Sequence, residues 1–169
     1  MESYDTEVTM NRKRILDIPT IKQLPKHCGP ASLSMILAYW NQPITQEDLA
    51  ELLGGKEHII ENGAQGKRIV ELAENLGYHV TKHYITDFEK ITETINRGVP
   101  ILAQLPHHFC VIRGYESEPK LLWVNDPART KNNPRPYTEF QTQWARPSLK
   151  YRTKYTGIVI EPRHLKQNL

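Results

Sequence analysis

The sequence predicts an α+β domain in which helices from the N-terminal half pack on a mainly antiparallel sheet from the C-terminal half. Two observations support this class. Apolar residues between positions 28 and 98 recur mainly with the period of a helix, with one strand pattern among them. From position 99 onward the pattern changes to short β-rich runs separated by turn residues, and the βαβ alternation of a parallel sheet is missing.

The first predicted elements are an extended segment and a buried helix. Pro19 and Pro25 exclude a helix over residues 14–25, since proline lacks the backbone N–H that a helix needs. Residues 28–40, CGPASLSMILAYW, carry Pro30 in a first helical turn, where proline is tolerated, followed by apolar residues on every face. This run is therefore predicted to be a central helix that is buried on all sides.

Three more helices are predicted, each ended by a glycine: residues 45–54, 67–77 and 86–98. Thr45 is the expected N-cap of the first of these helices. Thr86 and Glu89 have the spacing of a capping box at the start of the last one. Residues 78–85 alternate and are rich in β-formers, which predicts a strand between the last two helices.

Strands dominate the second half of the chain. The β-rich runs are residues 99–105, 108–115, 121–126 and 155–162, with a short helical piece over 138–145. One domain over residues 16–162 accounts for these elements, because 169 residues with 38% hydrophobic content suit a single core. Residues 1–15 are expected to be a flexible N-terminal segment, and residues 163–169 a tail.

Composition excludes several classes of function. The 22 basic and 19 acidic residues are scattered along the chain, and a formal charge of +3 does not indicate a nucleic-acid partner. No apolar run reaches the roughly 18 residues of a membrane span, and the polar N-terminus lacks the apolar region of a secretory signal. The expected compartment is therefore the cytoplasm, where Cys28 and Cys110 would be free thiols.

Cys28 is the first candidate for chemistry. It lies at the predicted N-terminus of the buried helix, where unpaired N–H groups and the helix dipole stabilise a thiolate over a thiol. A cysteine in that position can act as a nucleophile. The alternative is that Cys28 is a small buried apolar residue without a chemical role.

A nucleophilic thiolate also needs a base, and the base needs a group that orients it. His108 begins one predicted strand and Asp126 ends the next, so a hairpin would bring both to the same end of the sheet. Gln23 precedes Cys28 by one short loop and could donate its amide N–H to a developing oxyanion, together with the backbone N–H of Cys28. These residues describe a thiol hydrolase that needs no metal and no other cofactor.

Two alternatives for these residues stay open. His27, Cys28, His108 and Cys110 are of the types that bind zinc, although their spacing matches no zinc finger or ribbon. His107 could replace His108 as the base, because successive residues of a strand face opposite sides and only one of the two can meet Cys28. Cys110 is most simply a core residue near the site.

The box around Cys28, Gln-x4-Cys-Gly-Pro-Ala, is followed along the chain by HHFCVIRGY and VNDPA. In order and spacing these segments resemble the C39 and C39-like cysteine peptidases of the papain-like superfamily, which include the bacteriocin-processing leader peptidases. The resemblance covers residues 16–160. It implies a papain-like fold, a peptide or protein substrate, and four roles: nucleophile for Cys28, base for His108, orienting acid for Asp126 and oxyanion residue for Gln23.

Three features depart from the leader peptidases. Those enzymes usually carry Asp just before the cysteine, where this chain has His27, and Tyr-Gly after the helix, where it has Trp40 and Asn41. The sequence also ends at residue 169, without room for the ABC-transporter domains to which many leader peptidases are fused. These departures favour a stand-alone peptidase, and they leave open an association with a separate membrane transporter.

The predicted activity is hydrolysis of a peptide bond by the Cys–His–Asp triad. The same triad could instead run acyl transfer or deamidation, and the fold could also serve as a non-catalytic module that binds a peptide. The stretch DLAELLGG, residues 48–55, looks like a double-glycine leader, but an amphipathic helix ended by a glycine explains all of its residues. Cleavage after a double glycine is therefore not inferred.

Overall fold

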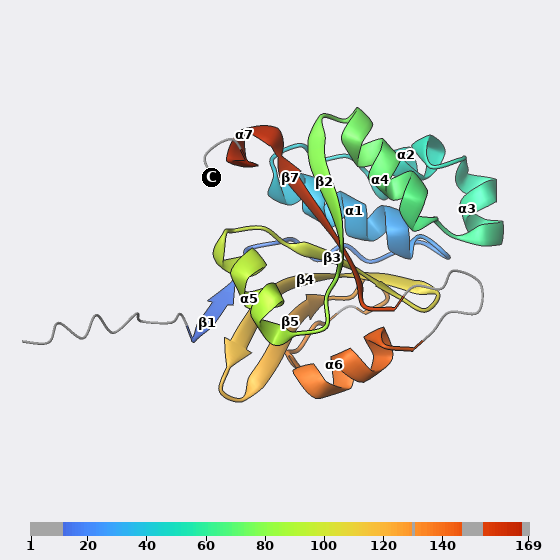
Figure 1. Cartoon of the computed structure of the whole chain (residues 1–169). Helices are drawn as coiled ribbons and strands as arrows, with labels where there is room; N and C mark the ends of the chain where they lie inside the picture. Colours follow the sequence, from blue (N-terminus) through green and yellow to red (C-terminus); the bar gives the residue numbers. More distant parts are fainter. Residues whose placement is uncertain (1–11, 130, 147–153, 167–169) are drawn as a thin grey trace, which may run out of the picture.

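The structure is a computed structural model that describes residues 12–129, 131–146 and 154–166. Its strands are β1 (Lys13–Ile15), β2 (Tyr78–Tyr84), β3 (Ile101–Leu105), β4 (His108–Ser117), β5 (Lys120–Asn125), β6 (Arg135–Pro136) and β7 (Thr156–Pro162). They form one seven-stranded sheet in the order β2-β7-β3-β4-β5-β6, and β1 pairs with the end of β4 (Figure 1). Every one of these strand pairs is antiparallel, as the sequence predicts.

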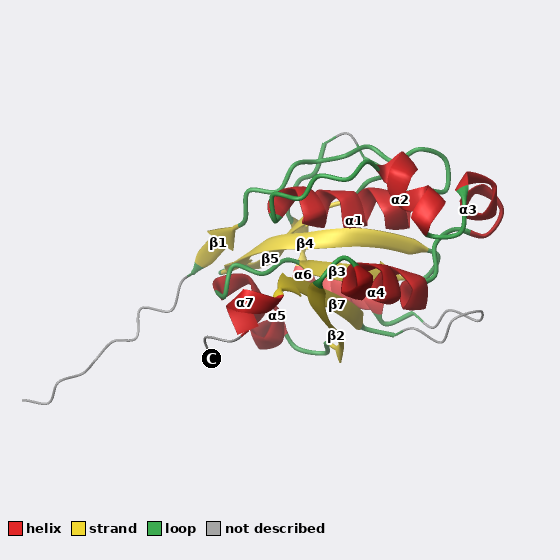
Figure 2. Ribbon diagram, turned by 90° about the horizontal axis from the view of Figure 1, so that it is seen from above, coloured by secondary structure: helices red, strands yellow, loops and turns green. Residues whose placement is uncertain are grey.

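Helices cover both faces of this sheet. They are α1 (Cys28–Tyr39), α2 (Gln46–Leu52), α3 (Lys56–Asn62), α4 (Gly66–Asn75), α5 (Phe88–Asn96), α6 (Tyr137–Trp144) and α7 (Arg163–Lys166). Figure 2 shows α1 on one side of β4, with α5 and α6 on the opposite side. The α+β class is therefore confirmed. Within the described ranges, none of the helices has the length and apolar character needed to cross a membrane.

The central position predicted for the first helix is correct. Residues 29–37 of α1 are all buried, which follows from their small or apolar side chains on every side of the helix. Gly29 allows the first turn of α1 to approach the loop between α3 and α4, since a Cβ at this position would lie 2.6 Å from the Ala64 side chain. This close packing brings that loop next to Cys28.

The structure corrects the prediction at one short helix and at one cap. Helix α3 is not predicted from the sequence, because Ile59 is its one buried residue and no apolar period marks it. The N-cap of α5 is Asp87, not Thr86, because Asp87 Oδ1 accepts a hydrogen bond of 2.7 Å from the N–H of Lys90. Thr86 and Asp87 are both of residue types that cap helices, and they lie one position apart.

The ends of the chain also differ from the prediction. The expected flexible segment and tail contain regular structure, namely β1 and α7. A three-residue strand and a four-residue helix are too short to carry a periodic pattern. The rest of those two segments, residues 1–11 and 167–169, lies outside the described residues.

The hairpin of β4 and β5 has the geometry that the sequence predicts. Val111 of β4 pairs with Asn125 of β5. His108, at the start of β4, and Asp126, just after β5, therefore lie at the same end of the sheet.

Candidate active site

Cys28 is the first residue of α1 and is half-buried. His27 occupies the N-cap position but makes no side-chain cap; its Nδ1 instead lies 2.7 Å from the carbonyl oxygen of Pro25. The first turn of α1 also holds no acidic residue. The positive end of the helix dipole therefore acts on Cys28 without a competing carboxylate or side-chain cap.

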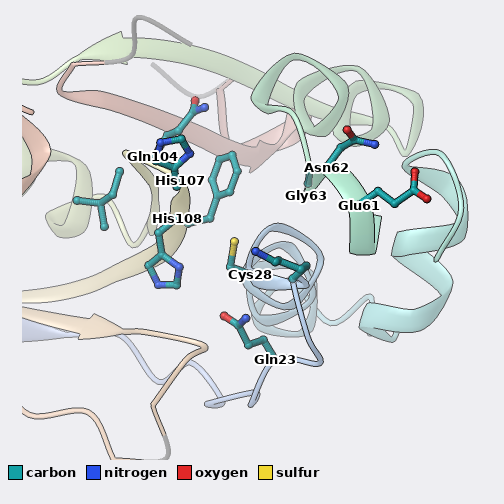
Figure 3. Close-up of a pocket in the computed structure, with 12 residues that line it drawn as sticks. Gln23, Cys28, Glu61, Asn62, Gly63, Gln104, His107 and His108 are labelled. Carbon is teal, nitrogen blue, oxygen red and sulfur yellow. The ribbon is translucent and has the colours of Figure 1, made fainter. Parts of the chain in front are cut away.

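His108 and Asp126 form a hydrogen-bonded pair. His108 Nε2 lies 2.7 Å from Asp126 Oδ1. Because Asp126 engages Nε2, the ring nitrogen left for Cys28 is Nδ1, and the thiol lies beside the imidazole at the cleft (Figure 3). The three side chains come from the start of α1, the start of β4 and the loop after β5.

The imidazole of His108 is held in its protonated form. Burial lowers its pKa, but hydrogen bonds to Asp126 and Cys28 and electrostatic interactions with both residues raise it more strongly, from 6.5 to about 9. At neutral pH this ring therefore carries a positive charge. A positive charge beside a cysteine is the environment that activates a thiol as a nucleophile.

Asp126 is buried and is held from several sides. Arg135 Nη2 lies 2.9 Å from Oδ2, and the N–H of Ala128 donates a 3.0 Å hydrogen bond to Oδ1. The backbone N–H of Asp126 donates to the side-chain oxygen of Asn132, at 3.1 Å. Burial raises the pKa of the carboxyl, but the hydrogen bond and charge of His108 and the hydrogen bond of Arg135 lower it well below its usual range. Asp126 therefore presents a negative charge to the imidazole throughout the neutral range.

Gln23 lies next to Cys28 in the loop before α1 (Figure 3). Its backbone N–H donates a 2.8 Å hydrogen bond to the carbonyl oxygen of Pro127, which ties this loop to the one that carries Asp126. Among the described residues, the side-chain Nε2 makes one long hydrogen bond, 3.4 Å to the carbonyl oxygen of Leu24. A hydrogen bond of this length is weak, so within the described ranges the Gln23 amide N–H can turn to a ligand.

A cleft of about 330 Å³ opens beside Cys28 (Figure 3). Three segments bound it: the loop before α1, the loop between α3 and α4, and the turn between β3 and β4. The cleft is also lined by Asn62, Gly63 and Gln104, which are not predicted from the sequence as site residues. They belong to no motif near Cys28, and tertiary packing alone brings them to the site.

Two residues of this cleft have left-handed backbones although neither is glycine. Lys26 has a φ of 64° and His107 a φ of 57°, and each lies within two positions of Cys28 or His108. Backbones in this region are costly for a residue with a Cβ and persist where the surrounding structure imposes them. The turns that present the thiol and the imidazole are therefore tightly determined by the fold.

The residues of the two alternatives, a zinc site and a base other than His108, have surroundings that differ from those of the triad. Cys110 is fully buried in β4, and this burial raises the pKa of its thiol. In the part of the chain that the structure describes, no group of three or more His, Cys, Asp or Glu side chains could hold a metal ion, so the ligands of the zinc alternative do not converge. His107 also lines the cleft, but it is His108 that bonds to Asp126.

An α+β fold with a cysteine at a helix start and a histidine–aspartate pair beside it is typical of cysteine-type peptidases, and a family match places the chain in that class. The chain is a member of the Peptidase_C39 like family, which matches residues 15–150. This match confirms the resemblance found in the sequence. A comparison with curated protein sequences finds no match.

Solved structures of peptidase domains have the same fold. A protein from Bacillus anthracis described as a C39-like peptidase gives a TM-score of 0.70 at 18% identity, over 90% of this chain and 99% of that one. A double glycine motif protease from an AMS/PCAT transporter, in complex with the leader peptide, gives 0.65 at 20% identity, over 88% and 94%. The peptidase domain of Streptococcus ComA, a bifunctional ABC transporter of a quorum-sensing pathway, gives 0.63 at 19% identity, over 85% and 98%. At these identities the likeness establishes the fold.

Proposed function

We propose that this chain hydrolyses peptide bonds with a triad of Cys28, His108 and Asp126 and with Gln23 as an oxyanion donor. The observation that carries the proposal is the 2.7 Å hydrogen bond between His108 Nε2 and Asp126, with the imidazole beside the Cys28 thiol. The cleft of about 330 Å³ next to this pair supplies space for a segment of peptide. The chemistry and the placement of the four residues support these proposed roles.

In this mechanism the Cys28 thiolate attacks the carbonyl carbon of the scissile bond, and the C=O electron pair moves onto the oxygen. Gln23 Nε2 and the backbone N–H of Cys28 donate hydrogen bonds to that oxyanion. The tetrahedral intermediate then collapses, the C–N bond breaks, and protonated His108 gives its proton to the leaving amine. Neutral His108 next takes a proton from water as the water oxygen attacks the thioester carbonyl. The C–S bond then breaks and releases the acid product, which restores the Cys28 thiolate and protonated His108.

The proposed substrate is a peptide or protein. Among similar folds, the PCAT transporter protease was solved with a leader peptide bound, which supports a peptide ligand for this cleft. Cys28 and Cys110 are both free thiols, which suits a reducing compartment, and the cytoplasm is the proposed location.

Incubation with a diverse peptide library, followed by mass spectrometry, tests this function. We expect cleaved peptides that share residues around one bond, and no cleavage by Cys28→Ala. A product joined to an added amine would indicate acyl transfer instead, and a side-chain amide converted to a carboxylate without cleavage would indicate deamidation. Peptides that the wild type and Cys28→Ala both bind but leave uncleaved would indicate a binding module and would overturn the proposal.

A further inference from the structure

Gln46 makes two hydrogen bonds to the loop that carries Gln23. It lies in the first turn of α2, far from the triad in sequence, and its side chain is buried with 8% of the residue exposed. Its Nε2 donates to the carbonyl oxygen of Lys22 at 2.9 Å, and its Oε1 accepts from the backbone N–H of Leu24, also at 2.9 Å. The Gln46 amide thus binds the backbone on both sides of Gln23.

This pair of hydrogen bonds matches the shape of a primary amide. One end of the group must donate and the other must accept, and the Lys22 carbonyl and the Leu24 N–H present the complementary pattern. Because the group is buried, loss of either hydrogen bond would leave a backbone polar atom unpaired. Both partners are main-chain atoms of the loop, so the loop is what Gln46 stabilises.

The backbone around Gln23 is therefore fixed at three points. Gln46 holds the residues before and after it, and Pro127 accepts the N–H of Gln23 itself at 2.8 Å. The Gln23 side chain, in contrast, makes one weak hydrogen bond to the residues that the structure describes, 3.4 Å to the carbonyl oxygen of Leu24. The position of the Gln23 amide in the cleft consequently depends on the backbone that Gln46 holds.

We propose that Gln46 is a positioning residue for the oxyanion site: it places Gln23 where a tetrahedral oxyanion would form. The inference rests on the proposed function, since it assumes that Gln23 is an oxyanion donor. Misplacement of a catalytic donor by about 1 Å can lower a rate by on the order of 10²-fold. Loss of the two Gln46 hydrogen bonds should therefore lower the reaction rate measurably.

Two chemical probes separate positioning from a general structural role. p-Nitrophenyl acetate acylates Cys28: the thiolate adds to the ester carbonyl, an oxyanion forms, and p-nitrophenolate leaves. Iodoacetamide alkylates the same thiolate by displacing iodide, and no oxyanion forms. A residue that acts only through Gln23 should therefore change the first rate and leave the second unchanged.

We expect Gln46→Met, which keeps the length of the side chain but removes both hydrogen bonds, to lower the acylation rate by about 10-fold to 10²-fold. Its iodoacetamide rate and its circular dichroism spectrum should match those of the wild type. Glu47→Gln is the matched control on the same turn of α2, because Glu47 is exposed. It should leave both rates at the wild-type level.

The Gln23→Ala background tests whether Gln46 acts through Gln23. Gln23→Ala alone should lose about 10²-fold to 10³-fold in acylation, as for removal of one oxyanion donor. Adding Gln46→Met to it should cost nothing further, since no donor is left to position. Additive losses would overturn the inference.

Gln46→Glu provides a second variant with a pH signature. An ionised carboxylate accepts from Leu24 but cannot donate to the Lys22 carbonyl, whereas a protonated carboxyl does both. The acylation rate of Gln46→Glu relative to the wild type should therefore rise as the pH falls. A ratio that stays constant with pH, or a Gln46→Met rate equal to the wild type, contradicts the inference. Full activity of Gln23→Ala would instead contradict the oxyanion role in the proposed function.

Discussion

Arg135 Nη2 lies 2.9 Å from Asp126 Oδ2, the carboxylate oxygen that is not bonded to His108. Arg135 and His108 thus bind opposite oxygens of one buried carboxylate. This arrangement fixes the rotation of the carboxylate and keeps Oδ1 directed at the imidazole. The positive charge of Arg135 also offsets part of the free energy that burial of the Asp126 carboxylate costs.

We therefore expect Arg135→Met to destabilise the protein. Removing one partner of a charged, largely buried hydrogen bond should lower the free energy of unfolding by about 1.5–3 kcal/mol. Urea denaturation at neutral pH measures this loss. Arg129→Met is the control. Arg129 Nε lies 3.8 Å from Oδ2 of the same carboxylate, but its side chain is 63% exposed. This substitution should therefore lower the free energy of unfolding by less than about 1 kcal/mol. Equal losses for the two variants would show that the Arg135 contact has no special weight.

The two thiols should differ sharply in reactivity. Cys28 lies at a helix start beside a protonated imidazole, whereas Cys110 is fully buried in β4. At pH 6, iodoacetamide should alkylate Cys28 far faster than Cys110, because only the accessible thiolate reacts. Peptide mapping by mass spectrometry after short incubations measures both rates. Similar rates would remove Cys28 from its proposed role.

Substitutions in the triad should rank in a defined order. Cys28→Ala should abolish peptide hydrolysis. His108→Ala should lower kcat/KM by about 10²-fold to 10⁴-fold, since it removes both the base and the acid. Asp126→Asn should be milder than either, because the Cys28–His108 pair can still form. The measurement is kcat/KM for the three variants, with circular dichroism to confirm that each is folded.

Cys110→Ala is the control for this ranking. Cys110 is fully buried and has no role in the proposed mechanism, so a folded Cys110→Ala protein should keep a kcat/KM close to that of the wild type. A folded but inactive Cys110→Ala would contradict the triad.

The raised pKa of His108 sets the alkaline limit of activity. Peptide hydrolysis needs the imidazolium as the acid that protonates the leaving amine, so kcat/KM should fall as the pH rises through about 9. Alkylation of Cys28 by iodoacetamide needs no acid and should not fall over the same range. Two pH profiles, one for each reaction, test this difference. A parallel fall in both rates would assign the alkaline limit to unfolding.

Stability should depend on the same proton. The pKa of His108 is higher in the folded protein, about 9 against 6.5, so folding favours the protonated ring. The resulting stabilisation is complete below about pH 6.5 and is lost as the pH rises to about 9. The difference in unfolding free energy between the wild type and His108→Gln should shrink over this interval in urea titrations. A difference that grows with pH would reverse the predicted sign.

Local patterns explain what the sequence predicts well. Pro30 followed by a run of small and apolar residues without a charge marks both the start of α1 and its burial, and hence the place of Cys28. The turn between β4 and β5 and their β-rich composition predict the hairpin that brings His108 to Asp126. In each case the information lies within one or two adjacent elements.

Contacts between distant segments explain what the sequence does not predict. Arg135, Gln46 and Gln104 are ordinary polar residues in the sequence, without a motif or a period. Their surroundings depend on where the fold brings their partners, such as the Lys22 and Leu24 backbone for Gln46. The loop between α3 and α4 packs closely on α1 at Gly29, where a Cβ would lie 2.6 Å from the Ala64 side chain.

The place of β7 in the sheet has a consequence for incomplete chains. β7 is the last strand in the sequence, yet it lies between β2 and β3, and β2 pairs with no other described strand. A polypeptide that terminates before residue 156 would contain every residue of the triad but would leave β3 at an open edge. All five residues of β3 are buried in the folded protein. An unpaired strand of this kind can pair with the same strand of another chain. Truncated or nascent polypeptides that lack β7 are therefore expected to aggregate.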